Sequence, residues 1–262
     1  MEPVPEAPHL SVVLITLNEE KRLELCLRSL PRGAEVVVLD SGSTDATVAL
    51  ARRNGARVES RAFTNYSEQK NAAIALATRP WVLSLDADEA LGPRLSAEIA
   101  RVTTSQESGV AGFRLRRRLV FMGRHLRFGK TSDAPLRLFR RGQGRFESAI
   151  HEKLVLADTA SVGRLGGELL HYSYEDLSDY FSRFNLYTTR VAENHQREGR
   201  AMPVGLLHVL RPWTEFLTRY VLRLGFLDGY PGYTYALLSS LYTYVKYAKL
   251  KELEDARRSA AS

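Results

Sequence analysis

Short apolar runs alternate with helix-periodic segments through the first hundred residues of the chain. Leu10–Thr16 (LSVVLIT) and residues 35–39 (EVVVL) are β-branched apolar runs, whereas residues 19–30 place an apolar side chain every three or four positions. Such runs are typical of buried strands, and such spacing is typical of amphipathic helices. The alternation continues, with strands predicted at residues 57–59 and 81–85 and helices at 44–54, 67–78 and 93–103. This order predicts an α/β fold in which helices cover both faces of a parallel sheet.

The pattern changes near residue 110. Short strands are predicted at residues 113–121, 136–139 and Lys153–Leu156, and the glycines between them indicate turns and mixed or antiparallel pairing. After residue 174 the spacing becomes helical again, with helices predicted at 175–197, 203–224 and 233–253. We therefore expect an α/β domain over residues 1–174 and a helical C-terminal extension over residues 175–262.

Composition places the chain among ordinary folded proteins. Its 262 residues are 44% hydrophobic and 26% charged, which excludes a disordered, collagenous or disulfide-stapled protein. The single cysteine, Cys26, falls in the helical pattern and is expected to be a small core residue in a reducing cytosol. No stretch approaches the roughly 20 apolar residues of a membrane-spanning helix, and MEPVPEAPHL lacks the order of a signal peptide. We therefore expect the protein to act inside the cell.

The formal net charge of +7 is unevenly distributed. Between Arg114 and Arg145, eleven basic residues accompany one acid, Asp133. Such a block predicts an anionic partner, which could be nucleic acid, a phospholipid surface or a phosphorylated substrate; a solvated charged face is the other interpretation.

Tyrosines are concentrated near the C-terminus. Seven of the twelve follow residue 219, where they are interleaved with arginines and lysines. Amphipathic rings beside cations are typical of a surface that contacts anionic lipid headgroups. The alternative is core packing, because Leu237, Leu241, Tyr244 and Ala248 recur at helical spacing and could cover the sheet.

The second predicted strand ends at Asp40, which begins the glycine turn DSGSTD (residues 40–45). Its carboxylate could accept a hydrogen bond from a ring N–H such as the imide of uracil. Helix capping by Ser43 or Thr44, with Asp45 in the first turn, is the alternative interpretation. The first strand is not followed by G-x-G-x-x-G, which disfavours a dinucleotide-binding Rossmann domain.

Asp86 and Asp88 follow the strand predicted at residues 81–85. In an extended segment, residues i and i+2 project to the same side, so both carboxylates could converge on one hard cation or on a metal-bound diphosphate. The alternative is a loop of acids before the helix that starts at Pro93, where negative charge is favourable.

Three further residues are candidates for the same site. Lys70, in the helix predicted at residues 67–78, could meet a phosphate or an acid from a strand end. Glu152, which follows His151, could be a general base, for which either its ordinary pKa of about 4.3 would have to be raised or the acceptor hydroxyl would have to be well placed. His171 could be an ordinary histidine or a metal ligand, and imidazole favours Mn²⁺ over Mg²⁺.

Together, the strand-end motifs resemble those of family-2 glycosyltransferases of the GT-A fold. In that family Thr-x-Asn-Glu, Asp-x-Gly-Ser-x-Asp and Asp-x-Asp motifs bind a nucleotide sugar. The corresponding segments here are TLNEE at residues 16–20, DSGSTD at 40–45 and DADE at 86–89. Residues 137–152 and 224–252 further resemble the bacterial lipopolysaccharide core glucosyltransferases. The resemblance therefore covers nearly the whole chain.

The resemblance implies a GT-A fold, a mixed and mostly parallel sheet between helices, with a C-terminal helical extension. It also implies nucleotide-sugar binding by residues of about 10–104, acceptor contacts from about 105–174, and a membrane-facing or acceptor-facing role for 175–262.

The resemblance also assigns roles to single residues. The nucleotide-binding set that it implies is Thr16, Asn18, Glu19, Asp40, Lys70 and Asp86. The first three would line the uridine pocket, Asp40 would contact uracil, and Asp86 would face the ribose or the donor sugar. Asp88 would bind a divalent metal, Mg²⁺ or Mn²⁺, on the diphosphate, His171 could complete the metal shell, and Glu152 would be the catalytic base. Two residues depart from the family pattern: Leu17 replaces a common aromatic residue, and His-Glu replaces Glu-Asp at the base.

The expected function is therefore that of an inverting, metal-dependent glycosyltransferase. It would move a hexose, glucose being favoured, from a UDP-sugar to a hydroxyl of a lipid-linked saccharide such as the lipopolysaccharide inner core. We expect a cytoplasmic protein that is peripheral on the inner face of the cytoplasmic membrane, with an anionic membrane surface as a partner and no nucleic acid. A polyprenyl- or protein-linked acceptor, a basic protein that binds nucleic acid or an anionic surface, and an inactive sugar-nucleotide binder are the alternatives.

Overall fold

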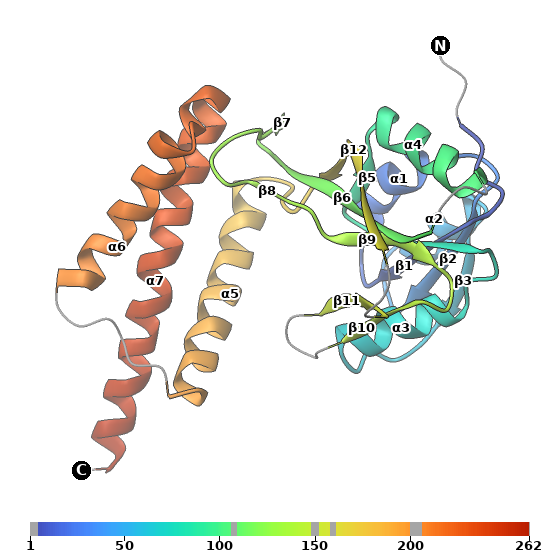
Figure 1. Cartoon of the computed structure of the whole chain (residues 1–262). Helices are drawn as coiled ribbons and strands as arrows, with labels where there is room; N and C mark the ends of the chain where they lie inside the picture. Colours follow the sequence, from blue (N-terminus) through green and yellow to red (C-terminus); the bar gives the residue numbers. More distant parts are fainter. Residues whose placement is uncertain (1–4, 106–108, 148–151, 158–160, 200–205, 262) are drawn as a thin grey trace. The chain divides into compact units, whose positions relative to one another are not determined.

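The computed structural model describes residues 5–105, 109–147, 152–157, 161–199 and 206–261. The chain forms two compact units (Figure 1). The first, which we call the sheet unit, comprises Met1–Arg118 and Asp133–Tyr172, and the second, the helical unit, comprises Leu119–Ser132 and Ser173–Ser262.

The sheet begins with four parallel strands in the order β3-β2-β1-β4. Their bounds are β1 Leu10–Thr16, β2 Glu35–Asp40, β3 Arg57–Ser60 and β4 Trp81–Asp86. The order then continues β9-β6-β12-β5, and β9 is antiparallel to both β4 and β6. These strands are β5 Glu89–Leu91, β6 Val110–Phe121, β9 Leu136–Arg140 and β12 Ser161–His171. The predicted change from parallel to antiparallel pairing near residue 110 is therefore confirmed.

Short strands complete the described part of the sheet unit and lead into the helical unit. Two of them, β7 Arg124–His125 and β8 Ser132–Asp133, pair with β6. A separate antiparallel hairpin consists of β10 Gly144–Glu147 and β11 Lys153–Leu156. Among all these strands, β5, β7, β8, β10 and β12 are not among those predicted from the sequence.

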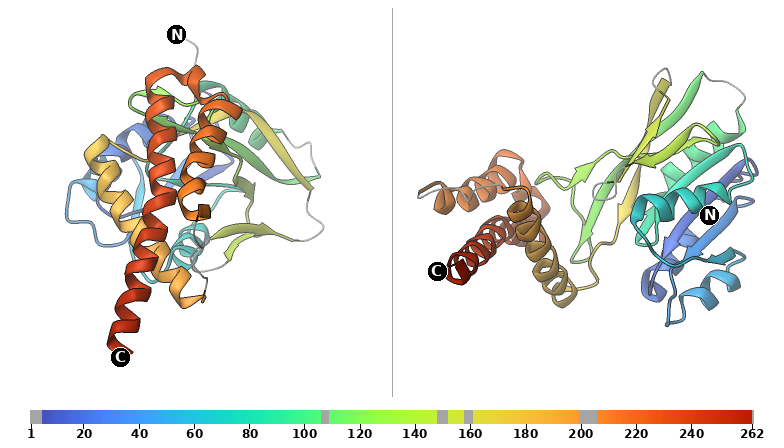
Figure 2. Two further views of the ribbon diagram at one scale, coloured as in Figure 1. Left: turned by 90° about the vertical axis from the view of Figure 1, so that its left-hand side faces the viewer. Right: turned by 90° about the horizontal axis from the view of Figure 1, so that it is seen from below.

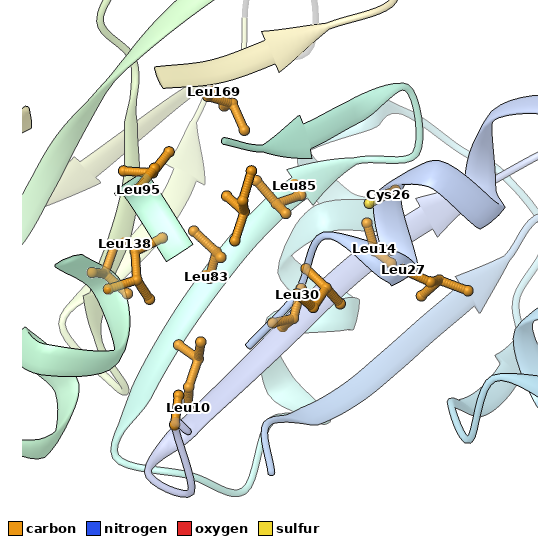
Figure 3. Packing of buried hydrophobic residues seen from close by; sticks show 14 of the residues in the cluster. Leu10, Leu14, Cys26, Leu27, Leu30, Leu83, Leu85, Leu95, Leu138 and Leu169 are labelled. Atoms are coloured by element: carbon orange, nitrogen blue, oxygen red, sulfur yellow. The ribbon is translucent and has the colours of Figure 1, made fainter. Parts of the chain in front are cut away.

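Helices cover both faces of the parallel strands, as the apolar pattern predicts. They are α1 Glu20–Arg28, α2 Thr47–Arg53, α3 Tyr66–Ala75 and α4 Pro93–Thr104. Alternate strand residues face opposite sides: Val12 and Leu14 pack in the cluster with α1, α2 and α4, whereas Val13 packs in the cluster with α3. Cys26 is buried in the first cluster, which confirms it as a core residue (Figure 3).

The helical unit is built around three helices, of which α7 packs against both others (Figure 2). They are α5 Leu177–Arg197, α6 Leu206–Leu217 and α7 Gly229–Ala261. The helix predicted at residues 203–224 ends early: α6 passes into the π-helical turn η1 Thr218–Leu222, and Leu224 is left-handed (φ 57°) before the 3₁₀ turn η2 Gly225–Asp228. No helix in the described part of the chain is both long enough and apolar enough to cross a bilayer.

Candidate functional site

The ends of β1 and β2 are joined by hydrogen bonds around Asp40. Its carboxylate accepts hydrogen bonds from the Thr16 hydroxyl (2.9 Å), from the backbone N–H groups of Gly42 (2.9 Å) and Ser43 (2.8 Å), and from the Ser43 hydroxyl. Burial raises the pKa of the Asp40 carboxyl, but the hydrogen bonds from Ser43, Gly42 and Thr16 lower it by more than burial raises it. The pKa therefore lies below its ordinary value. Asp40 is therefore an ionised carboxylate that fixes the turn after β2.

Helix capping does not explain this turn. The following helix, α2, begins only at Thr47, and its N-cap residue is Ala46, whose side chain offers no hydrogen-bonding group. The interpretation of Ser43 or Thr44 as the N-cap is therefore wrong, because both residues serve the contact between the two strand ends. Asp45 does lie at this end of α2, where its carboxylate accepts a hydrogen bond from the Thr47 N–H (3.0 Å).

Asn18 connects the turn after β1 to the turn after β2. It adopts a left-handed conformation (φ 55°), its side-chain carbonyl accepts a hydrogen bond from the Thr44 N–H, and its own N–H donates to the Ser43 hydroxyl, each at 2.9 Å. The neighbouring Glu19 N–H donates to the Thr47 hydroxyl (2.8 Å). The structure thus brings Thr16, Asn18, Glu19 and Asp40 together at one edge of the sheet, as expected for adjacent parallel strands.

Asp86, at the end of β4, lies between two cations. One carboxylate oxygen is 2.9 Å from the Lys70 ammonium, and the other is 2.6 Å from the Arg137 guanidinium. Burial raises the pKa of the Asp86 carboxyl, but the charges of Arg137 and Lys70 outweigh it and hold the pKa well below its ordinary value. The expectation that Lys70 meets an acid from a strand end is confirmed.

Lys70 also reaches Glu152. Its ammonium lies 3.3 Å from the Glu152 carboxylate and is only 4% exposed. The ring of Phe146 lies below the same ammonium, 5.1 Å from its centroid. One buried lysine therefore connects the end of β4 to the residue proposed as the base, whereas His151, which precedes that residue, lies outside the described residues.

Asp88 has partners of its own. The extended conformation expected for residues 86–88 ends at Asp86, and Ala87 and Asp88 form a turn between β4 and β5. Asp88 Oδ2 lies 3.3 Å from Nε2 of His171, at the end of β12, and 3.8 Å from the Arg22 guanidinium. The two carboxylates thus meet different side chains, because the chain turns between them.

Asp88 and His171 place a carboxylate oxygen and an imidazole nitrogen 3.3 Å apart, and both are donor types that bind divalent cations such as Mn²⁺. Among the described residues no group of three or more His, Cys, Asp and Glu side chains could hold a metal. The described residues would therefore supply at most two ligands.

Comparison with known proteins identifies the family. The model of the family described as Glycosyl transferase family 2 matches residues 11–151, which include both strand-end turns and the Asp86–Asp88 segment. The chain belongs to this family. The mixed sheet with helices on both faces and helices at the C-terminus is accordingly the expected GT-A fold.

Relatives of this glycosyltransferase extend over most of its length. It is 30% identical over 259 residues to "Lipopolysaccharide core biosynthesis glycosyltransferase LpsC" of Rhizobium meliloti (strain 1021), covering 94% of this chain and 93% of the relative. It is 27% identical to "Uncharacterized glycosyltransferase RT0209" of Rickettsia typhi, covering 93% and 87%. The resemblance to lipopolysaccharide core enzymes is confirmed.

Solved structures match a smaller part of the chain. A crystal structure of glucosyl-3-phosphoglycerate synthase from Mycobacterium tuberculosis with Mn²⁺, uridine diphosphate and glucosyl-3-phosphoglycerate is 28% identical, with a TM-score of 0.34. The match covers 42% of this chain and 44% of that structure's chain.

Two residues of the glycosyltransferase site were not predicted from the sequence. Glu89, wholly buried on β5, accepts hydrogen bonds from Arg137 (3.0 Å) and Arg117 (3.1 Å), and its second oxygen accepts one from the Asp86 N–H (3.0 Å). Arg137, on β9, is 5% exposed and binds both Asp86 and Glu89. A charged residue inside an apolar strand indicates a buried ion pair, but Arg137 lies in an arginine-rich segment, where one more arginine does not stand out.

The basic block of the glycosyltransferase is divided between the two units of the chain. Arg117 and Arg137 bind Glu89, Arg118 binds Glu168, and Arg145 binds Glu147. The segment between Arg118 and Asp133 belongs to the helical unit, where Arg124, Arg127 and Lys130 are exposed. Several arginines of the block therefore neutralise acids of the fold.

Proposed function

We propose that this glycosyltransferase transfers a hexose, glucose being favoured, from a UDP-sugar to a hydroxyl of a lipid-linked saccharide such as the lipopolysaccharide inner core, with inversion. Family membership supports the transfer of a sugar, and the full-length relative named for lipopolysaccharide core biosynthesis supports the acceptor class. The observation that carries the proposal is that one buried lysine, Lys70, holds Asp86 and Glu152 beside each other.

The donor would bind at the joined ends of β1 and β2. We assign Thr16, Asn18 and Glu19 to the uridine pocket, because they lie in the turn that the Asp40 network fixes. A contact between Asp40 and uracil requires the Ser43 hydroxyl to turn away, since the carboxylate already accepts four hydrogen bonds. Asp86 would face the ribose or the donor sugar, with Lys70 holding its orientation.

A divalent cation, Mn²⁺ or Mg²⁺, would be held by Asp88 and His171. When bound, it would supply positive charge that stabilises the departing diphosphate. The imidazole favours Mn²⁺ over Mg²⁺. Asp88 is only 16% exposed in its side chain, so a cation there would reduce the cost of burying its charge.

Glu152 is the proposed general base. Its carboxylate would take the proton of the acceptor hydroxyl while that oxygen forms a bond to the anomeric carbon. The bond from the anomeric carbon to the diphosphate breaks in the same step, and its electron pair leaves with UDP. One displacement inverts the anomeric centre. Lys70 would hold the Glu152 carboxylate in position for this step.

The proposed acceptor also suggests where the enzyme works. A lipid-linked saccharide is held at a membrane surface, so we propose a cytoplasmic enzyme that is peripheral on the inner face of the cytoplasmic membrane. A polyprenyl- or protein-linked acceptor would use the same donor site.

A thermal-shift panel tests the donor half of this proposal. UDP, GDP, CDP and dTDP are each added with and without Mn²⁺ or Mg²⁺. UDP with metal at about 100 times its dissociation constant should stabilise the folded protein by about 2.7 kcal/mol. Asp88→Asn should abolish the metal dependence of the shift. The absence of a shift with every nucleotide, in protein shown to be folded, would contradict the proposed donor site.

A further inference from the structure

The reversal between α6 and α7 exposes large apolar side chains. Leu222 is 74% exposed, Leu227 54% and Tyr230 70%, and the neighbouring Leu224 and Phe226 are exposed as well. Soluble proteins do expose single apolar residues, but a run of this density within ten residues is typical of a surface that meets another apolar phase. Figure 1 shows this reversal where α6 and α7 meet.

A second loop of the helical unit is bound to this reversal. The buried Asp228 carboxylate accepts hydrogen bonds from the backbone N–H groups of Arg127 (3.0 Å) and Phe128 (2.9 Å). The Gly129 N–H donates to the Arg223 carbonyl (2.9 Å). Residues 122–130 and 221–230 therefore form one structure, whose exposed side chains we call the reversal surface.

The charge of the reversal surface is positive. Arg124, Arg127, Lys130 and Arg223 are exposed, whereas the acid Asp228 is buried against backbone amides. The next acid along the chain, Glu215, is bound by Arg219 at 2.6 Å. Exposed cations among exposed apolar side chains fit the headgroups and acyl boundary of an anionic bilayer.

The backbone supports a role for these side chains. Four non-glycine residues in the described part of the chain have positive φ, and three of them, Met122 (φ 50°), Lys130 (φ 61°) and Leu224 (φ 57°), lie in the reversal surface. Bulky residues are uncommon in this conformation, which glycine or asparagine adopts at lower cost. The side chains of all three are exposed, so packing inside the fold does not explain why larger residues occupy these positions.

Apolar side chains are also exposed on α7 and α6. On α7, Leu237, Leu241 and Tyr244 are 46%, 41% and 44% exposed. The residues of α7 that do pack inward are others, including Leu238, in the cluster with Phe121. On α6, Trp213 is 65% exposed and Leu217 51%. The apolar exposure therefore continues along both helices from the reversal.

We propose that the reversal surface docks this protein on anionic lipid, with Leu222, Phe226, Leu227 and Tyr230 entering the interface and Arg124, Arg127, Lys130 and Arg223 meeting the headgroups. A second copy of the chain is the less favourable occupant, because two surfaces of the same positive charge would repel each other. Anionic lipid would bring the enzyme to a lipid-linked acceptor, and this role rests on the proposed function. The observations behind the docking surface come from the helical unit alone.

A native tryptophan reports the contact. Trp213 is exposed on α6, whereas Trp81, the other tryptophan, is 2% exposed in the sheet unit. Vesicles of phosphatidylcholine with phosphatidylglycerol should shift the emission to shorter wavelength and should float the protein, and vesicles of phosphatidylcholine alone should do neither. Trp213→Phe should abolish the emission shift without abolishing flotation. Salt should weaken the binding.

Matched variants separate the reversal surface from exposure in general. Leu222→Asn with Leu227→Asn should weaken vesicle binding roughly tenfold or more, because two apolar side chains no longer enter the interface. Leu186→Asn, at a leucine on α5 that is 46% exposed, should leave binding unchanged. Arg223→Gln with Lys130→Gln should weaken binding to anionic vesicles roughly tenfold or more at low salt, whereas Arg257→Gln near the end of α7 should not.

The measurements use the full chain without nucleotide or acceptor, so they do not depend on the proposed transfer reaction. Absence of vesicle binding, equal binding to neutral and anionic vesicles, or equal losses in the Leu186→Asn control would overturn the docking proposal. So would a dimer in solution that Leu222→Asn with Leu227→Asn converts to monomer. Transfer to an acceptor in detergent micelles tests the proposed function separately, and the reversal-surface variants should retain it.

Discussion

Arg137 is an almost wholly buried guanidinium between the carboxylates of Asp86 and Glu89. The three charges are tolerated in the interior because each one offsets the others. A buried charge that loses its partner still carries the full free-energy cost of its desolvation. The arrangement also fixes the direction of Asp86 from the side opposite Lys70. Arg137 is therefore a positioning residue for the proposed donor site.

Replacing this arginine should be strongly destabilising. We expect Arg137→Met to lower the free energy of unfolding by about 3–5 kcal/mol, because Asp86 and Glu89 would remain buried with less positive charge between them. Urea unfolding measures the change. Arg137→Met combined with Glu89→Gln should be less destabilised than the single variant, since one of the negative charges is gone. The exposed pair of Arg145 and Glu147 provides the control, and Arg145→Met should change stability by about 0–1 kcal/mol. Equal effects at the two arginines would contradict the interpretation.

Glu152 gives a second prediction at the scale of single residues. Glu152→Gln keeps the shape of the side chain and removes the basic oxygen, so turnover should fall by roughly 10²–10⁴-fold if it is the general base. The thermal shift with UDP and metal should be retained, because the donor site is not altered. Glu147→Gln, on the neighbouring hairpin, is the matched control. Near-normal turnover of a folded Glu152→Gln protein would remove Glu152 from this role.

At the scale of elements, the approach of β12 to α4 depends on glycine. A Cβ atom on Gly167 would lie 2.4 Å from the backbone nitrogen of Leu95, closer than real contacts allow. The same strand ends at His171, which faces Asp88, so its distance from α4 also sets one side of the proposed metal site.

Gly167→Ala should therefore force β12 away from α4. We expect a loss of stability of about 1–3 kcal/mol, as for other overpacked interiors, together with weaker metal dependence of nucleotide binding. Gly109→Ala has no atom within 4 Å of its added Cβ and serves as the control. Calorimetry of both variants checks the first effect, and thermal shifts with Mn²⁺ and UDP check the second. The prediction fails if the two alanines have the same effect.

The sequence predicts the parallel strands of the sheet but not β12. The parallel strands are predicted because burial on both faces requires continuous apolar runs, as in β1 and β4. By contrast, β12 carries three glycines, which disfavour strands in general and are needed here for close packing. The strand-end residues of the site were predictable because parallel strands end at one edge. The pairing of Arg137 with Glu89 was not, since it joins β9 to β5 across 48 positions of sequence.

At the scale of the whole molecule, the two units differ in the groups that titrate. The sheet unit contains Asp40 and Asp86, whose pKa values lie below the ordinary range although burial raises both. At Asp40 the hydrogen bonds to the carboxylate outweigh the effect of burial. At Asp86 the charges of Arg137 and Lys70 outweigh it. The helical unit contains ten of the twelve tyrosines. Burial raises the pKa of four of them, Tyr174, Tyr180, Tyr235 and Tyr242.

These shifts predict opposite responses to pH. A carboxyl whose pKa is lower in the folded state stabilises the fold above the unfolded value of about 3.9, and the stabilisation is lost as pH falls toward the folded pKa. A tyrosine whose pKa is higher in the folded state stabilises the fold below about 10, and the stabilisation is lost as pH rises from there. Acid should therefore act first on the sheet unit, and alkali first on the helical unit.

Separate probes can follow the two units in one titration. Trp213→Phe leaves Trp81, in the sheet unit, as the sole tryptophan, and tyrosinate absorbance reports mainly on the helical unit. In acid, Trp81 fluorescence should change before the helical circular dichroism of α5 and α7 is lost. In alkali, tyrosinate absorbance should rise late and together with loss of helix, while Trp81 still reports a folded sheet. Simultaneous changes of all probes at both extremes would show that the units unfold as one, because coupling between them would then exceed the difference in their titrating groups.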